Sequence, residues 1–68
     1  MSALARQWAT NRVRRIARRW GALEARGQLG DPTTFALRQV RALAWLKGCS
    51  RDDIDNATAA GTLEGLRS

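Results

Sequence analysis

One cluster of turn-forming residues divides the chain. Residues 27–32 read Gly-Gln-Leu-Gly-Asp-Pro, so that two glycines, an aspartate and a proline fall within six positions. Such a cluster marks a turn between two longer elements, and weaker breaks follow at Gly48 and Gly61. Between these breaks, no segment alternates apolar and polar residues for long enough to form a strand. The chain therefore has only helices with which to build a fold.

Three helices are expected, over residues 2–26, 33–47 and 50–60. The first is rich in alanine, arginine and leucine and contains no proline. Asp31 or Thr33 is expected to cap the second helix, and Gly48 to end it. Ser50 is expected to cap the third, because its hydroxyl can accept a backbone hydrogen bond and the acids after it suit the positive end of the helix dipole. Residues 62–68 are expected to form a short turn or a frayed tail.

Apolar residues recur along each expected helix at spacings of three and four, which places them on one side. In the first helix this stripe consists of Ala5, Ala9, Val13, Ile16, Trp20 and Leu23. In the second the arc is wider and contains Phe35, Leu37, Val40, Leu43, Ala44 and Leu46. The third offers Ile54, Ala57 and Thr58, followed beyond the break by Leu63 and Leu66. These stripes can bury one another, so we expect an all-α, compact three-helix domain with a long basic first helix.

The size and composition argue against catalysis. The chain has 68 residues, and a domain of that size buries only about 60% of its unfolded surface. We expect one domain, residues 1–68, with no deep preorganised cavity. Histidine is absent, and the one cysteine, Cys49, can neither form an intrachain disulfide nor hold a metal ion without other ligands. We therefore expect no enzyme activity, no catalytic or metal-binding residues and no cofactor. So small a core also leaves a homodimer open.

The sequence gives no sign of a membrane protein or of secretion. The longest apolar run, residues 42–46, is far shorter than the roughly 20 residues that span a bilayer. With a single cysteine, a reducing compartment is the simplest expectation, and we expect a cytoplasmic protein.

Charge is the most informative property of the sequence. Twelve basic residues against six acidic ones give a net charge of +6, and eleven of the twelve are arginine. The excess lies in residues 1–48, which hold ten basic and two acidic side chains, whereas residues 49–68 hold two basic and four acidic ones. Such an excess predicts an anionic partner: nucleic acid, an acidic protein surface or an anionic membrane. A high-GC genome would explain arginine in place of lysine, but it would not explain the clustering.

The densest part of this charge lies in residues 12–20, Arg-Val-Arg-Arg-Ile-Ala-Arg-Arg-Trp, where five arginines occur. Such a surface can neutralise several phosphates. The alternatives are a solvated face that keeps the protein soluble and an amphipathic targeting segment. We discount targeting, because the apolar stripe is rich in alanine and continues into a region with a folded pattern. Binding to a membrane surface is discounted because the stripe has too few bulky apolar side chains.

Tryptophan accompanies arginine on two of the expected helices. Trp8 lies among Arg12, Arg15 and Arg19 on the basic side of its helix, one turn from Arg12 and two from Arg15, and Trp45 lies beside Arg38 and Arg41. Nucleic-acid surfaces and protein hot spots both combine these residue types. The alternative is that each indole closes the edge of the core under arginine stems; Trp20, on the apolar stripe, is expected in the core. The candidate binding residues are Trp8, Arg12, Arg15, Arg18, Arg19, Arg38, Arg41 and Trp45.

Residues 42–57 resemble the helix-turn-helix of DNA-binding regulators. The matching positions hold a small residue in the first helix, a glycine at the turn, a small apolar residue, a serine and an aliphatic residue, namely Ala44, Gly48, Cys49, Ser50 and Ile54. The resemblance implies that the third helix would read DNA bases. That helix, however, carries Asp52, Asp53 and Asp55 at its start, and phosphates would repel these acids. If DNA is bound, we expect the first helix to carry the contact.

Two functions are compatible with these features. The first is a small basic nucleic-acid-binding protein, regulatory or architectural, that contacts phosphates through the arginine-rich first helix. The alternative is a small interaction protein of the kind that phages and mobile elements encode, an inhibitor or assembly factor. It would use the same arginine and tryptophan surface to bind an acidic site on a larger protein partner.

Overall fold

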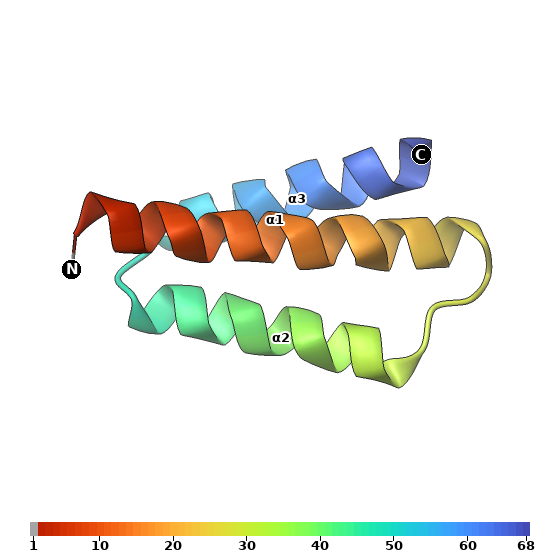
Figure 1. Ribbon diagram of the computed structural model, residues 1–68, viewed down its shortest axis with the longest axis horizontal. Coiled ribbons are helices and arrows are strands. Elements are labelled where there is room, and N and C mark those ends of the chain that lie inside the picture. The colour runs from red at the N-terminus through yellow and green to blue at the C-terminus, as the bar shows by residue number, and fades with distance from the viewer. Residues whose placement is uncertain (1) are drawn as a thin grey trace.

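Three helices make up the fold. The structure, a computed structural model, describes residues 2–68, and its helices are α1 (Ala3–Ala25), α2 (Asp31–Leu46) and α3 (Arg51–Arg67). Figure 1 shows that α2 runs antiparallel to α1 and that α3 then runs in the same direction as α1. No strand occurs within residues 2–68, so the expected all-α, three-helix fold is confirmed. The molecule measures 38 × 21 × 16 Å along its principal axes.

Side-chain caps begin two of the helices, and glycine turns end two of them. The hydroxyl of Ser50 accepts a hydrogen bond from the backbone N–H of Asp53 at 3.1 Å, which confirms the expected cap of α3. Gly27 (φ 67°) and Gly48 (φ 89°) adopt the left-handed conformation that closes a helix C-terminus. The backbone N–H of the residue after each glycine donates to a carbonyl five positions earlier, at 2.8 Å and 3.0 Å respectively.

The second helix begins earlier than expected. Gly30 is its N-cap, without a side-chain hydrogen bond, and Asp31 already lies in the first turn. The expected caps, Asp31 and Thr33, are therefore both inside the helix. Pro32 suits this start, since the first turn of a helix needs no N–H donor from its residues.

The third helix differs most from expectation. It continues through Gly61 to Arg67, and the expected tail over residues 62–68 is helical as far as Arg67. Gly61 does not break the helix because it is buried against α1. A methyl group at this position would overlap the carbonyl oxygen of Arg14 and lie 2.8 Å from the Cβ atom of Ala17. The glycine therefore serves a close approach of two helices rather than a turn.

The core has two parts. The larger cluster joins all three helices and the turn before α3, and consists of Ala9, Val13, Val40, Ala44, Cys49 and Ile54. The other part is a line of small residues along the contact of α1 with α3, namely Ala17, Gly21, Gly61 and Gly65, all buried. The expected stripe of α1 contained Ala9 and Val13 but missed Ala17 and Gly21.

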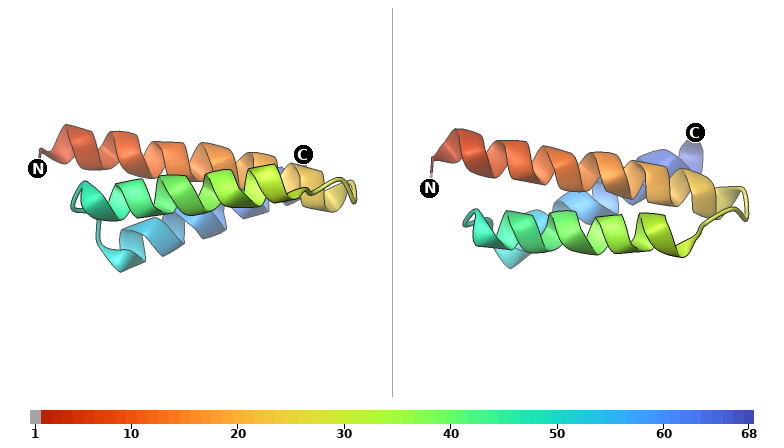
Figure 2. Two further views of the ribbon diagram at one scale, coloured as in Figure 1. Left: turned by 90° about the horizontal axis from the view of Figure 1, so that it is seen from below. Right: turned by 60° about the horizontal axis from the view of Figure 1, so that its bottom comes forward.

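Several residues of the expected apolar stripes lie at the surface. Phe35, Leu46, Leu63 and Leu66 are exposed by 60%, 73%, 50% and 45%. The reason is geometric: α1 lies against both other helices, whereas α2 and α3 contact each other much less. The right view of Figure 2 shows that α3 starts near the end of α2 and then moves away from it, toward the far end of α1. No helix within residues 2–68 is long and apolar enough to span a membrane.

Candidate functional site

The arginines of α1 form a continuous arc. At about 100° per residue, the four side chains at positions 12, 15, 18 and 19 cover about 120° of the helix circumference, on the side away from the buried Val13. We call Arg12, Arg15, Arg18 and Arg19 the arginine face. Arg15, Arg18 and Arg19 are exposed, and Arg12 is half-buried. The structure thus brings together the four arginines of α1 that the sequence indicated.

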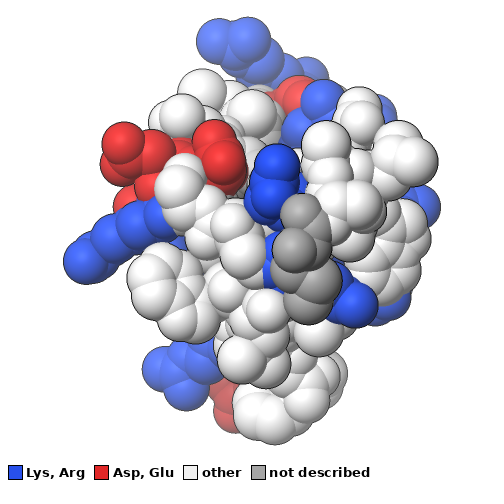
Figure 3. All heavy atoms as spheres, turned by 90° about the vertical axis from the view of Figure 1, so that its left-hand side faces the viewer, with Lys and Arg blue, Asp and Glu red and all other residues white. Residues whose placement is uncertain are grey.

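The arginine face has no neutralising partner among the described residues. The acid of α1, Glu24, lies more than a turn beyond Arg19. Arg15, Arg18 and Arg19 take part in no ion pair within residues 2–68. Asp52 and Asp53 are in the first turn of α3, and Figure 3 shows most of the acidic side chains on that end of the molecule gathered on one side. These acids lie on α3, where Asp55 pairs with Arg41 and Arg51, and within the described residues none of them forms an ion pair with the arginine face.

Trp8 anchors one end of the arginine face. Its side chain is 46% exposed, and the Cζ atom of Arg12 lies over the ring at 5.2 Å from the centroid. The Nζ atom of Lys47, which follows α2, lies 5.9 Å from the same centroid. Both cations are within the range of cation–π attraction. Trp8, Arg12, Arg15 and Ile16 also line a hollow of 440 Å³. The indole thus holds two cations in place at the surface, and Lys47 is a site residue that sequence spacing did not reveal.

Trp45 belongs to a second group. Its side chain is 62% exposed, and with Arg41, Ala42, Arg51 and Ile54 it lines a hollow of 340 Å³. Because it is two residues from Lys47, it points about 200° around α2 from that residue. Trp45 therefore lies on the other flank of α2 from Trp8, and the structure does not unite the two tryptophan–arginine groups.

The two arginines that the sequence places beside Trp45 differ from each other. Arg38 is exposed. Arg41 donates to the carboxylate of Asp55 at 2.8 Å and to the hydroxyl of Thr58, and so links α2 to α3. Its guanidinium is directed at partners within the protein, an internal role that the sequence did not indicate.

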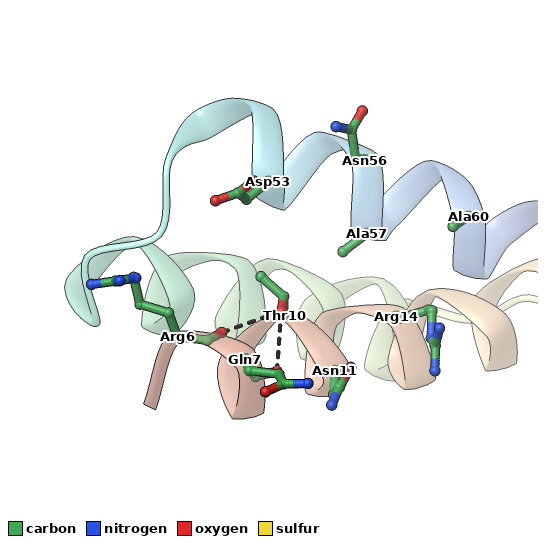
Figure 4. A pocket seen from close by; sticks show the side chains of 9 residues that line it. All are labelled: Arg6, Gln7, Thr10, Asn11, Arg14, Asp53, Asn56, Ala57 and Ala60. Atoms are coloured by element: carbon green, nitrogen blue, oxygen red, sulfur yellow. Dashed lines mark hydrogen bonds between the residues drawn. The ribbon is translucent and has the colours of Figure 1, made fainter. Parts of the chain in front are cut away.

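A polar hollow of 460 Å³ lies between α1 and α3 (Figure 4). Its lining residues are Arg6, Gln7, Thr10, Asn11, Arg14, Asp53, Asn56, Ala57 and Ala60. The hydroxyl of Thr10 donates back to the carbonyls of Arg6 and Gln7 at 3.2 Å and 3.0 Å. The hollow holds charges of both signs, in contrast to the arginine face. Arg14 extends the positive charge of α1 toward α3, and its spacing of four from Arg18 was the signal that could have included it.

The turn between α2 and α3 fits the positions of the helix-turn-helix resemblance. Gly48 has positive φ, Cys49 is 3% exposed, Ser50 caps α3, and Ile54 is 5% exposed. The Sγ atom of Cys49 lies 3.5 Å from the carbonyl oxygen of Arg6, so this cysteine packs against α1. These positions are explained by packing, and the acids at the start of α3 remain exposed.

Comparison of the chain with protein-family models, with curated proteins and with solved structures found no match. What the protein does must therefore be inferred from its own residues.

Proposed function

We propose that this protein binds nucleic acid, and that the arginine face of α1 contacts the phosphate backbone. The observation that carries the proposal is the exposure of Arg15, Arg18 and Arg19 on one continuous arc without an acidic partner among the described residues. A guanidinium group binds phosphate through two parallel hydrogen bonds, which a lysine ammonium cannot do. Several such groups on one side of a helix can contact several phosphates at once.

The repulsion within the arginine face supports the proposal. Arg15 lies three or four positions from each of the other three arginines, and like charges at these spacings destabilise a helix. The arginine face therefore lowers the stability of the folded protein. Residues that lower stability in this way are expected at functional sites. A polyanion would remove the repulsion and release its own counterions.

Trp8 favours contact with a duplex backbone over stacking on single-stranded bases. Proteins that hold single strands offer open aromatic faces on which bases stack. Here Arg12 and Lys47 lie over the ring of Trp8, so a base would first have to displace a cation. The indole instead holds two positive groups at one end of the arginine face, which adds to the positive charge available for phosphate contacts.

A salt series tests the proposal. With four phosphate contacts, the affinity for random duplex DNA is expected to fall with a log–log slope of about −3 to −4. Arg15→Ala and Arg19→Ala should each reduce the magnitude of this slope by about 1. Arg67→Ala is the matched control, since it removes the same charge from an exposed position at the end of α3. Fluorescence anisotropy with a labelled duplex and a single strand of the same length gives the affinities.

Three results would count against the proposal. The first is no binding at about 0.1 M salt, where phosphate contacts are strong. The second is an equal loss of slope in Arg15→Ala and Arg67→Ala, which would indicate a general charge effect rather than the arginine face. Tighter binding to the single strand would refute the preference for a duplex.

An acidic site on a larger protein is the second candidate. The observation that favours it is the pair of tryptophans, 46% and 62% exposed, on a surface rich in arginine, because tryptophan and arginine dominate protein hot spots. A pull-down with and without nuclease separates the candidates. A partner that is retained after nuclease treatment and lost in Trp8→Ala or Trp45→Ala would favour this second function.

A further inference from the structure

The side of α2 that faces away from α1 is largely apolar and uncovered. Phe35, Ala42 and Leu46 lie about 180° around the helix from the buried Val40 and Ala44. In the left view of Figure 2, α2 lies in front of both other helices, and neither covers the side facing the reader. We call Phe35, Arg38, Ala42, Trp45 and Leu46 the outer face of α2.

We propose that the outer face of α2 binds a second copy of this chain, with the two α2 helices antiparallel and related by a twofold axis. Such an interface uses the same surface on both copies. Ala42 lies near its centre, and its small side chain lets the two helices approach closely. On either side of it, Phe35 of one copy lies opposite Leu46 of the other.

The available apolar area fits a small dimer interface. Phe35, Trp45 and Leu46 are 60%, 62% and 73% exposed, and a large aromatic side chain covers roughly 150–250 Å². Together with Ala42, these residues offer about 400 Å² per copy and about 800 Å² for two copies. Specific interfaces begin at about 1,200 Å², of which about 65% is apolar in homodimers. The outer face therefore offers at most the apolar area of the smallest specific interfaces, which corresponds to a weak dimer.

Charges at the ends of the two helices are complementary in this arrangement. In an antiparallel pair the start of one α2 lies beside the end of the other, where Arg51 lines the hollow next to Trp45. Asp31 is exposed at the start of α2, and the side chain of Arg51 is 88% exposed. Each Asp31 would thus lie beside Arg51 of the second copy, twice in the dimer. Arg38 of one copy would lie within reach of the indole of Trp45 of the other, a cation–π arrangement.

The symmetry also determines where the remaining surfaces lie. A twofold axis between two antiparallel helices is perpendicular to their common plane, so each flank of α2 adjoins the same flank in the copy. Lys47 and Trp8 lie on one flank, and Arg41 with its α3 partner Asp55 lies on the other. The Trp8 ends of both arginine faces would therefore lie on one side of the dimer.

Sedimentation velocity of the purified chain tests the proposal, at about 0.3 M salt so that the net charge of +6 is screened. The wild type should change from one to two chain masses between about 20 µM and 1 mM, a range appropriate for a small interface. Ala42→Glu places a charge at the closest approach and should weaken the dimer at least tenfold. Ala59→Glu is the matched control, because it introduces the same charge at an exposed alanine within α3 and should leave the dimer unchanged.

Circular dichroism of both variants confirms that the helices are retained. If Ala42→Glu is unfolded, Phe35→Gln replaces it, since Phe35 is 60% exposed and contributes little to the core. A wild type that stays monomeric at 1 mM, including one that is captured only by a different protein, would overturn the proposal. So would a dimer that Ala42→Glu and Ala59→Glu weaken equally, because it would use another surface.

Discussion

Replacing Gly61 with alanine tests how closely α3 lies on α1. At an open position in a helix, this substitution stabilises a protein by about 1 kcal/mol, because alanine loses less backbone entropy on folding than glycine does. At Gly61 the added methyl would instead overlap the carbonyl oxygen of Arg14 and lie 2.8 Å from the Cβ atom of Ala17. Neither atom can rotate away, because the first belongs to the backbone of α1 and the second is fixed to it directly. The helices would have to separate.

The expected loss follows from these two opposing effects. Overpacking costs roughly 1–3 kcal/mol, and a clash with backbone lies at the upper end of that range. After subtraction of the helix preference of alanine, the free energy of unfolding should fall by about 2 kcal/mol. Since 1 kcal/mol corresponds to about 4–8 °C in Tm for a domain of this size, Tm should fall by roughly 10 °C. Thermal unfolding followed by far-UV circular dichroism measures it.

The control is the reverse substitution at a neighbouring open position. Ala59 is exposed in α3, so Ala59→Gly should lower the stability by about 1 kcal/mol through helix preference alone. Gly65→Ala should repeat the result of Gly61→Ala, because a methyl there would overlap the carbonyl oxygen of Arg18 and lie 2.7 Å from the backbone nitrogen of Ala22. If Gly61→Ala leaves Tm unchanged or raises it, the close contact of α1 with α3 does not exist in solution.

Two further substitutions test the ends and the bridge of α3. Ser50→Ala removes the acceptor for the N–H of Asp53 and should lower the stability by about 1 kcal/mol, a fall of several degrees in Tm; an unchanged Tm would show that the cap is not formed. Arg41→Met removes the ion pair with Asp55 and the hydrogen bond to Thr58. Because these side chains are 36% and 50% exposed, the loss should be about 1 kcal/mol, and part of it should disappear in high salt. A loss that does not depend on salt would assign the effect to packing of the arginine stem.

The start of α3 and the arginine face could be predicted because each depends on residues close in sequence. Ser50 caps α3 through an N–H three positions away, and the arginines lie opposite the apolar stripe of the same helix. The ion pair of Arg41 could not be predicted in this way, because its partner Asp55 lies on another helix. The turn at Gly48 brings the two residues together. Lys47 beside Trp8 is a contact of the same kind.

The glycines of α3 show why the end of that helix was predicted wrongly. Local preference treats Gly61 as a break, since glycine weakens a helix interior by about 1 kcal/mol. Here the glycine is buried against Arg14 and Ala17 of α1, and the contact that it permits outweighs that preference. A glycine can end a helix or allow it to pack closely against another helix. For Gly61 the outcome depends on residues of α1 that are more than 40 positions away in the chain, so a local sequence pattern cannot predict it.

The close packing of α3 on α1 also explains how α1 can contact both other helices and still expose the arginine face. Bulky side chains at a helix contact would occupy a wide part of the circumference of α1 and would hold α3 further out. Ala17 and Gly21 on α1, with Gly61 and Gly65 on α3, reduce that contact to a narrow line. The remaining arc of about 120° stays open to solvent and holds Arg12, Arg15, Arg18 and Arg19. The small residues between α1 and α3 are thus what leaves enough of the α1 surface exposed for the four arginines.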